Sequence, residues 1–302
     1  MADRVLDFAE GAAYLHVKDE QLVVERDGRP VASVPLGDIA IIIMAHPRVT
    51  CTQAVFAGLM DRGAALITCD RGHLPTGMLL PTVAHFTQAE RFAAQAQASL
   101  PRKKRAWQQI VREKIRAQAA LLEDLHADGA ALRELAKRVR SGDPENVEAQ
   151  AARRYWALLF DDPQFRRRRD GDGPNRLLNY GYAVLRAVVA RAICAAGLHP
   201  SLGLHHHNRY DPYCLADDLM EPYRPVVDAA VVEHVRCFGK DAPLDRRGKQ
   251  ALLEPLTGRF LAEKEARTLF DLAARTASSL AQLYQGDARR LWYLREIRCA
   301  GD

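Results

Sequence analysis

Carboxylates, histidines and arginines gather in three short polar clusters that interrupt otherwise apolar, helical stretches of the sequence. In residues 217–225, Asp218 and Glu221 stand three positions apart, so they share one face if this stretch is helical. Two carboxylates on one face repel each other unless a cation lies between them, and Arg224 is a candidate for that role. The segment is therefore either an ion-paired helix end or part of an oxygen-rich site for a divalent metal.

Residues 143–148 form the second polar cluster, with the sequence Asp-Pro-Glu-Asn-Val-Glu. Asp143 is a candidate N-cap and Pro144 a candidate first helical residue. Glu148 then falls about one turn into an apolar-rich helix. Taken alone, a carboxylate at this place is typical of a solvated helix position, so any chemical role depends on its neighbours.

Three consecutive histidines, His205, His206 and His207, form the centre of the third cluster. Solvated rings in a polar loop are one interpretation, but imidazoles also act as metal ligands and proton shuttles. One histidine together with Glu148 and Glu221 would make a two-carboxylate, one-imidazole site for Mg²⁺ or Mn²⁺. Such a site polarises a phosphoryl oxygen and orients an attacking hydroxyl. The clusters offer no thiolates, which argues against a structural zinc.

Two runs of four basic residues accompany these clusters. Each run by itself is typical of a solvated face, but near a candidate metal site both favour contacts with nucleic-acid phosphates. Polar and aromatic residues after the second run either bind phosphates, stack on unpaired bases, or cap and pack a helix. The candidate DNA-binding residues are Arg102, Lys103, Lys104, Arg105, Arg166, Arg167, Arg168, Arg169, Asn175, Asn179 and Tyr180.

The elements that must position these residues change character near residue 85. The earlier residues predict one short helix at 52–61, and Asp27-Gly28 predicts a hairpin turn. Strands are predicted at residues 4–8, 13–17, 21–25, 29–35, 39–44 and 64–69. Residues 39–44 are continuously apolar, as in a strand buried on both faces.

After residue 85, the apolar residues recur at helical spacing. Helices are predicted at residues 86–99, 107–125, 144–160, 176–197, 215–235, 247–255 and 259–285. In the second of these, Gln118 is expected to be the one polar interruption of the apolar stripe. The sequence thus predicts an α+β protein, in which a small β-rich N-terminal domain (1–84) precedes a larger all-α catalytic domain (85–302).

The composition is that of a globular protein. The chain has 302 residues, 48% apolar and 27% charged, which excludes disordered and fibrous classes. Its most apolar central stretch, 182–198, is interrupted by Arg186 and Arg191, and its first ten residues lack the apolar core of a signal peptide. The six cysteines form no CxxC pair and predict reduced thiols. We expect a cytoplasmic protein with no membrane partner.

The net charge of +5 is unevenly distributed along the chain. Residues 1–80 carry seven Lys or Arg and ten Asp or Glu, so the N-terminal part is mildly acidic and the remainder is basic. Such asymmetry points to a polyanionic partner, most often nucleic acid.

Five segments match the pattern of one known family. They are residues 4–24 (RVLDFAEGAAYLHVKDEQLVV), 145–160 (ENVEAQAARRYWALLF), 175–187 (NRLLNYGYAVLRA), 197–208 (GLHPSLGLHHHN) and 215–228 (LADDLMEPYRPVVD). In their order and spacing, along nearly the whole chain, they resemble the CRISPR-associated protein 1 family. The match is closest to the branch that accompanies single-effector, type II systems. Its members are integrases that insert new spacers into a CRISPR array.

The resemblance implies a metal site made of a glutamate, a histidine and an acidic residue, which fall on Glu148, His206 and Glu221. The family motif His-His-x-Asn places the ligand on the second histidine. Because the x position is itself a histidine in this chain, His207 stays an alternative. Many relatives carry aspartate where Glu221 stands. Asp218 matches a nearby acidic position with a supporting role.

The resemblance also implies the reaction and the partners. The 3′-hydroxyl of a short DNA duplex attacks a phosphodiester at the repeat boundary, and the absence of a GxxxxGK[ST] loop fits an exchange of bonds without ATP. The family forms homodimers, two of which flank a dimer of a small ferredoxin-like subunit in a heterohexamer. We expect the acidic N-terminal domain to supply the homodimer interface. The basic surface would bind DNA with an affinity that falls steeply with salt.

Two other functions remain open from the sequence. The first is a metal-dependent nuclease of branched DNA that acts in repair without integration. The second is a DNA-binding scaffold whose own site is inert. The first differs from an integrase in that it does not join a 3′-hydroxyl end to repeat DNA. The second differs in that replacing Glu148 or Glu221 leaves the assembled complex active.

Overall fold

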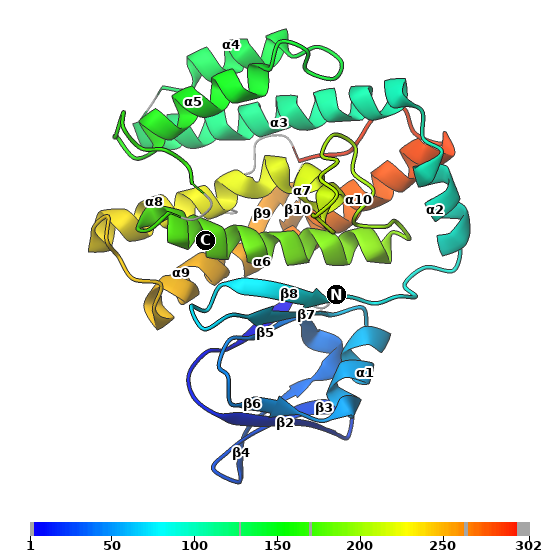
Figure 1. Ribbon diagram of the computed structural model, residues 1–302, viewed down its shortest axis with the longest axis vertical. Coiled ribbons are helices and arrows are strands. Elements are labelled where there is room, and N and C mark those ends of the chain that lie inside the picture. Colours follow the sequence, from blue (N-terminus) through cyan, green and yellow to red (C-terminus); the bar gives the residue numbers. More distant parts are fainter. Residues whose placement is uncertain (1–2, 127, 169–170, 263–264, 295–302) are drawn as a thin grey trace.

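The computed structural model describes residues 3–126, 128–168, 171–262 and 265–294, and it confirms the predicted fold class (Figure 1). Strands from the first part of the chain lie together at one end, and a larger, mostly helical part lies over them. Arg169 and Cys299 lie outside the described residues.

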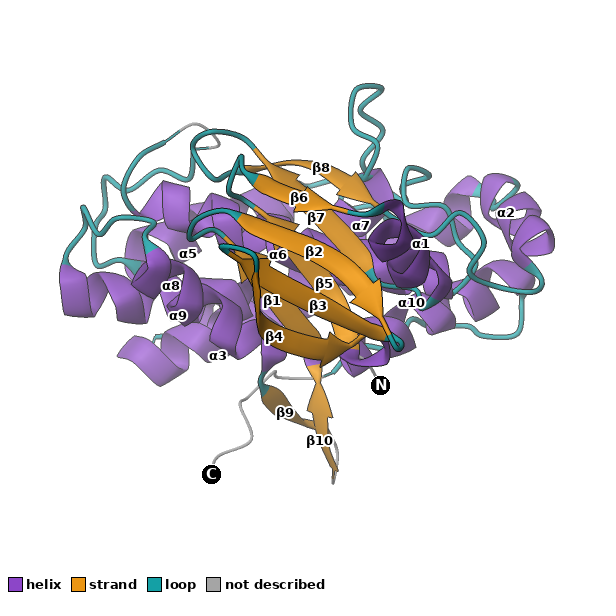
Figure 2. Ribbon diagram, turned by 90° about the horizontal axis from the view of Figure 1, so that it is seen from below, coloured by secondary structure: helices purple, strands orange, loops and turns teal. Residues whose placement is uncertain are grey.

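The N-terminal strands form two four-stranded sheets that pack face to face (Figure 2). The first sheet has the order β1 (Arg4–Phe8), β5 (Ile39–Met44), β7 (Ala65–Cys69) and β8 (Pro75–Leu79). The second has the order β4 (Arg29–Pro35), β3 (Gln21–Arg26), β2 (Ala13–Lys18) and β6 (Val49–Cys51). Helix α1 (Gln53–Asp61) follows β6. The sequence analysis did not predict β6, which has only three residues, or β8, which begins at Pro75.

The predicted hairpin is confirmed, because β3 and β4 pair antiparallel on either side of Asp27-Gly28. Both turn residues have positive φ angles, 50° and 71° respectively, as a type I′ turn requires.

Strand β5 joins the two parts of the molecule. Its side chains are divided between two apolar clusters: Ile39 and Ile42 pack between the sheets, while Ile41 and Ile43 pack with the helices. This confirms that the apolar run forms a strand buried on both faces. Helix α6 (Pro174–Ala195) contacts β5, β7 and β8.

The other helices are arranged around α6 and α3, with α5 and α4 on the outer side of α3 (Figure 1). Their bounds are α2 (Gln88–Ala96), α3 (Leu100–His126), α4 (Ala130–Arg138), α5 (Val147–Leu159), α7 (Cys214–Met220), α8 (Arg224–Phe238), α9 (Arg246–Thr257) and α10 (Leu269–Gln285). Helix α4 was not predicted. The predicted helix 215–235 is divided by a short 3₁₀ turn, η2 (Glu221–Tyr223), because Pro222 and Pro225 lack the N–H groups that would continue it.

The helix predicted over 259–285 is wrong for residues 259–262 and 265–268. These residues form the antiparallel strands β9 (Arg259–Ala262) and β10 (Glu265–Thr268), so the second part of the chain is mostly rather than entirely helical. Helix α10 begins only at Leu269, where the backbone N–H of Asp271 donates to Thr268 Oγ1 at 3.3 Å. The sequence Thr-x-x-Asp at 268–271 is a signal for the start of a helix. The prediction from apolar periodicity did not use this signal and placed the start at residue 259.

Helix α6 is the one described helix that is long and apolar enough to cross a membrane, but 72% of its most apolar window is buried inside the protein. Its neighbours are α7, α8, α9, α10 and the first sheet. The apolar composition of α6 therefore reflects its place at the centre of the core.

Gly181 allows α6 and α8 to approach closely. A Cβ at this position would lie 2.4 Å from Val227 Cγ1. Alanine is intrinsically better than glycine in a helix by about 1 kcal/mol, but forcing a methyl group into a packed core costs about 1–3 kcal/mol. We therefore expect Gly181→Ala to lower the free energy of unfolding by up to about 2 kcal/mol in urea titrations. Val227→Ala should lower the free energy of unfolding less in the Gly181→Ala variant than in the unaltered protein. If the two losses simply add, the close contact between these residues is contradicted.

Candidate active site

Side chains from separate helices converge on one buried ammonium group. Lys114 on α3 places its Nζ 2.6 Å from Glu148 Oε1 on α5 and 2.7 Å from Glu221 Oε2 in η2. Burial alone would lower the pKa of Lys114, but the charges of Glu221 and Glu148 outweigh it and raise that pKa. The structure thus brings together two of the carboxylates that the sequence singled out, and holds a positive charge between them.

Lys114 was not among the predicted site residues. It lies on the same face of α3 as Trp107 and Ile110, seven and four positions earlier, so the expectation that Gln118 is the one polar interruption of that stripe is wrong. A lysine inside an apolar stripe is a detectable signal, because a lysine is seldom buried without a partner. The sequence alone does not show which carboxylates that partner would be.

The start of α5 orients Glu148. The helix begins at Val147 rather than at Pro144, because the Asp143 carboxylate accepts hydrogen bonds from the backbone N–H groups of Val147 at 2.9 Å and Glu148 at 3.0 Å. Asn146, with φ 49°, is the N-cap. The carboxylate of Glu148 therefore stands in the first helical turn, where the helix dipole favours negative charge.

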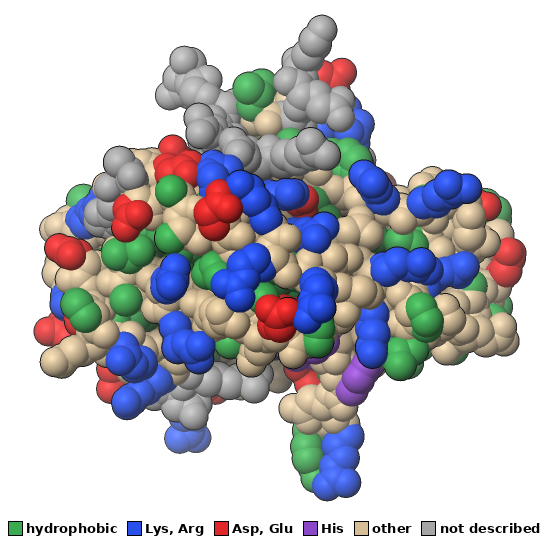
Figure 3. Space-filling model, turned by 90° about the horizontal axis from the view of Figure 1, so that it is seen from above, with side chains coloured by type: hydrophobic (Ala, Val, Ile, Leu, Met, Phe, Trp, Pro, Cys, Tyr) green, Lys and Arg blue, Asp and Glu red, His purple; other side chains and the backbone are tan. Residues whose placement is uncertain are grey.

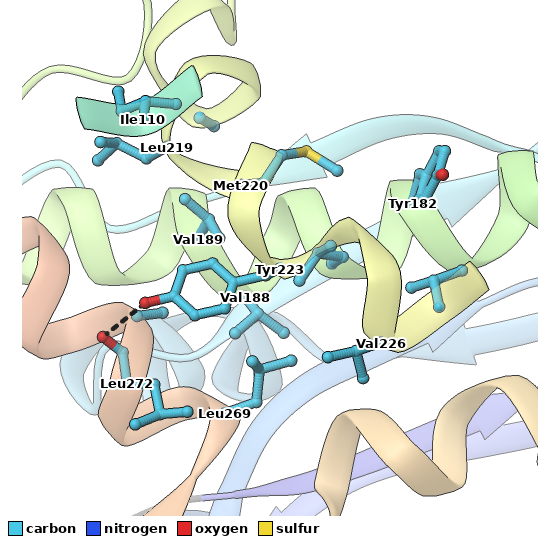
Figure 4. Packing of buried hydrophobic residues seen from close by; sticks show 14 of the residues in the cluster. Ile110, Tyr182, Val188, Val189, Leu219, Met220, Tyr223, Val226, Leu269 and Leu272 are labelled. Atoms are coloured by element: carbon cyan, nitrogen blue, oxygen red, sulfur yellow. Dashed lines mark hydrogen bonds between the residues drawn. The ribbon is translucent and has the colours of Figure 1, made fainter. Parts of the chain in front are cut away.

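Glu221 is held in the turn between α7 and α8. Its side chain is 5% exposed, and Arg224 NH2 lies 3.0 Å from its Oε1. Arg224 was a candidate cation between Asp218 and Glu221, but the Asp218 carboxylate binds the histidine loop instead. Burial opposes ionisation, but Arg224 and Lys114 together lower the pKa of Glu221. The flanking Met220 and Tyr223 point into the apolar core, where Tyr223 donates a hydrogen bond to Leu272 O at 3.2 Å (Figure 4). The turn is thus fixed by packing on both sides of the carboxylate.

Asp218 organises the histidine loop. It is completely buried on α7, and its carboxylate accepts hydrogen bonds from the backbone N–H groups of Leu204, His205 and His206 at 2.6, 3.0 and 3.3 Å. The same carboxylate lies 2.6 Å from His206 Nδ1. This hydrogen bond is the main reason that the pKa of His206 is raised. Asp218 therefore fixes both the loop backbone and the orientation of one imidazole.

The three histidines have different surroundings. The ring of His205 stacks on Trp107 with the centroids 4.3 Å apart, and burial lowers its pKa. His206 meets the same indole edge-on at 5.7 Å, while its bond to Asp218 leaves Nε2 available. His207 is exposed and makes no side-chain hydrogen bond within the described part of the chain. The geometry favours His206 over His207 as a ligand.

The carboxylates of Glu148 and Glu221 and the imidazole of His206 are the right kinds of ligand for a hard divalent cation. They are not arranged around a common metal position in this structure. Among the described residues, no group of three or more His, Cys, Asp or Glu side chains is arranged to hold a metal ion. Glu148 and Glu221 instead share the ammonium of Lys114. Carboxylate oxygens, and an imidazole oriented through its second nitrogen by Asp218, are nevertheless the ligands that Mg²⁺ or Mn²⁺ would use.

The basic runs are placed differently from one another. Residues 102–105 lie in the first turns of α3, where Lys104 and Arg105 are exposed, while Arg102 donates to Tyr284 O at 2.8 Å. Arg166 and Arg168 are exposed in the loop before α6. These side chains remain candidates for phosphate contacts.

Other predicted DNA-binding residues serve the fold in this structure. Arg167 donates to Asn175 Oδ1 and Asn179 Oδ1 at 3.1 and 2.6 Å. Asn175 also accepts the backbone N–H of Arg168 at 2.8 Å. Tyr180 is completely buried and donates to Asp7 Oδ2 at 3.3 Å, so its ring has no face to offer to a base. The two asparagines attach the arginine-rich loop to α6 by hydrogen bonds. Of the roles left open by the sequence, this is the one in which these residues cap and pack a helix.

A buried carboxylate lies behind Arg224. Asp228 on α8 accepts hydrogen bonds from the hydroxyls of Tyr155, at 2.6 Å, and Tyr182. Arg224 and Arg167 both lie over the ring of Tyr182, 4.7 and 5.2 Å from its centroid. Burial raises the pKa of Asp228 to about 6, against the opposing effect of the tyrosine hydroxyls. This network links α5, α6 and α8 beside the site.

Comparison with known proteins identifies the family. Residues 8–237 match the sequence model described as CRISPR associated protein Cas1. The chain belongs to the Cas1 family. The CRISPR-associated endonuclease Cas1 of Neisseria meningitidis serogroup C (strain 8013) is 40% identical over 253 residues, which cover 83% of this chain and 82% of that protein. The resemblance drawn from the sequence motifs is thereby confirmed.

Solved structures share the Cas1 fold along the whole chain. A casposase bound to integration product has a TM-score of 0.73 at 20% identity, covering 96% of this chain and 92% of the casposase. A Cas6-RT-Cas1–Cas2 complex has a TM-score of 0.74 at 19% identity, covering 98% of this chain and 36% of that chain. At these identities the likeness is one of fold.

The raised pKa of Asp228 makes stability depend on pH. The folded state binds this proton more tightly than the unfolded state, so stability is lost as the pH rises from about 4 through about 6. Asp228→Asn keeps the size and one accepting oxygen, so it retains one of the two accepted tyrosine hydrogen bonds, and it does not titrate. Urea titrations between pH 4 and pH 7 should show the unaltered protein losing roughly 2–3 kcal/mol relative to this variant. Parallel pH profiles would show that Asp228 does not titrate in this range.

Proposed function

We propose that this Cas1-family chain is a metal-dependent DNA endonuclease and integrase of CRISPR adaptation. In this role it joins the 3′-hydroxyl ends of short DNA duplexes to the repeat array. The observation that carries the proposal is the convergence of Glu148 and Glu221 on one positive charge, next to an imidazole that Asp218 orients. The family consists of CRISPR-associated endonucleases, and an integrating casposase shares its fold.

Each site residue has a definite task in this reaction. Glu148, His206 and Glu221 would hold a divalent cation, Mg²⁺ or Mn²⁺, which would polarise a phosphoryl oxygen and favour ionisation of the attacking hydroxyl. Asp218 binds His206 through Nδ1, which would leave Nε2 as the nitrogen that takes a metal. Arg224 offsets the charge of Glu221 inside the core. Exchange of one phosphodiester for another conserves the number of bonds and needs no nucleotide cofactor.

The charged surface supports a DNA partner. Lys and Arg side chains spread over the face seen from the α3–α5 side, with histidine at one edge (Figure 3). The exposed Lys104, Arg105, Arg166 and Arg168 would contact the DNA backbone and so contribute to affinity rather than to sequence choice. The complex named above contains Cas1 and Cas2, which supports a Cas2 subunit as the partner of this chain. We infer that this small subunit would bridge two dimers into a heterohexamer in the cytoplasm, as the family resemblance implies.

Strand transfer tests the function and the site together. The protein, with and without the small subunit, is mixed with a duplex bearing 3′-hydroxyl ends and a supercoiled plasmid carrying the repeat. Joined product should require Mn²⁺ or Mg²⁺ and should fall at least about a hundredfold in Glu148→Gln, Glu221→Gln and His206→Ala, because metal polarisation contributes several kcal/mol. Glu145→Gln, an exposed glutamate three residues before Glu148, is the matched control.

The other outcomes of this assay select the alternatives. Metal-dependent cutting without joining would indicate a branched-DNA repair nuclease. Full activity of the assembled complex after Glu148→Gln and Glu221→Gln would indicate an inert scaffold whose chemistry comes from another subunit.

The sheet edges support homodimerisation through the N-terminal domain. Strands β1 and β4 are edge strands of their sheets, and they line one groove together. Val31 on β4 is 56% exposed, an apolar side chain on an edge that can pair with a second copy. The acidic balance of this domain also suits a protein contact better than a DNA contact.

A charge on this edge tests the dimer. Val31→Asp should shift the full-length protein from dimer to monomer in sedimentation velocity, because a buried carboxylate at an interface costs more than it gains. Val83→Asp, an apolar-to-acidic change at another exposed position, should leave the dimer intact. A dimer that persists in Val31→Asp would place the interface elsewhere.

A further inference from the structure

Lys114 stands where the proposed function needs a metal ion. Its Nζ lies within 2.7 Å of a carboxylate oxygen from each of Glu148 and Glu221, and its side chain is 11% exposed. The contact with Glu148 is a hydrogen bond, whereas Glu221 Oε2 meets the ammonium as an ion pair without hydrogen-bond alignment. The position between the two carboxylates is therefore taken by a cation of the chain itself.

The charges around this position balance without a metal. Glu148 and Glu221 contribute two negative charges, while Lys114 and Arg224 contribute two positive charges. A divalent cation entering the same space would meet an ammonium group within contact distance of both ligands. At that range like charges repel by several kcal/mol in a partly buried site.

We propose that Lys114 is a resident counter-cation of the metal-free site, which holds Glu148 and Glu221 together until a divalent metal displaces its ammonium from between them. This inference rests on the proposed metal site, and it concerns how this chain keeps the two carboxylates together before a metal binds. Lysine suits the task, because a flexible four-carbon stem lets the charge move without moving the helix.

An ordinary structural ion pair is the competing interpretation. It also explains why Lys114 is buried, and it also predicts that removing the charge destabilises the protein. It does not predict that a metal ion restores what was lost. Metal dependence of stability and affinity therefore separates the two interpretations without measuring activity.

The test compares thermal midpoints and Mn²⁺ affinity in the full-length protein. Lys114→Met leaves two neighbouring carboxylates short of a counter-charge, so its midpoint in EDTA should fall by roughly 5–10 °C and should recover in saturating Mn²⁺. In calorimetric titration, Mn²⁺ should bind this variant about tenfold or more tightly than the unaltered protein. Lys114→Gln, which keeps a polar side chain, should shift in the same direction and serves if the methionine variant does not fold.

Lys249 on α9 provides the matched control. It is also a buried lysine, 4% exposed, but it lies beside Asp7 and Tyr180 rather than at the site. Lys249→Met should lower the midpoint in EDTA with no specific recovery in Mn²⁺.

The outcomes separate this proposal from the proposed function. Unchanged Mn²⁺ affinity in both Lys114 variants, with no metal-specific recovery, overturns the counter-cation and leaves an ordinary ion pair. Glu148→Gln tests the metal site itself. If this variant binds Mn²⁺ as tightly as the unaltered protein, the metal site fails, and the counter-cation fails with it. If Glu148→Gln loses Mn²⁺ while Lys114→Met binds it unchanged, only the counter-cation fails.

Discussion

The constraint on which this structure depends is the burial of carboxylates close together. Removing a carboxylate from water costs several kcal/mol unless partners replace its hydration, and a second carboxylate nearby adds repulsion. The helical part of the chain meets this constraint in three ways. Glu221 is paired with Lys114 and Arg224, Asp218 accepts backbone N–H groups of the histidine loop, and Asp228 accepts two tyrosine hydroxyls.

Each solution also performs a positioning task. The ion pairs of Glu221 bring α3 against the turn between α7 and α8. The hydrogen bonds to Asp218 fix the backbone of the histidine loop, which lies between helices and has no regular secondary structure. The network of Asp228 ties α8 to α5 and α6. Removing one of these carboxylates would therefore change the shape of the site as well as its charge. The polar groups fix the geometry of the site, whereas apolar side chains in their place would contribute stability alone.

Helix α3 connects the apolar and polar parts of this design. One face carries Trp107 and Ile110 into the core, and the same face presents Lys114 to the two glutamates. The indole of Trp107 packs against His205 and His206, so a single side chain supports both the core and the loop. Meanwhile α6 and β5 fix the helical part to the sheets through apolar contacts. The two glutamates thus lie on helical elements, and the loop that carries His206 is fixed by Asp218, as a preorganised centre requires.

The sequence by itself determined what depends on near neighbours. Alternation and apolar runs located most strands and helices, and Asp27-Gly28 fixed a turn. The order and spacing of five segments identified the family, and the family motif pointed to Glu148, His206 and Glu221. Local signals failed where partners lie far along the chain. Only the tertiary structure placed Lys114 between carboxylates 34 and 107 positions away, and buried Tyr180 against Asp7. Periodicity reports which face of a helix is apolar, whereas the partner of a buried charge is decided by which elements pack together.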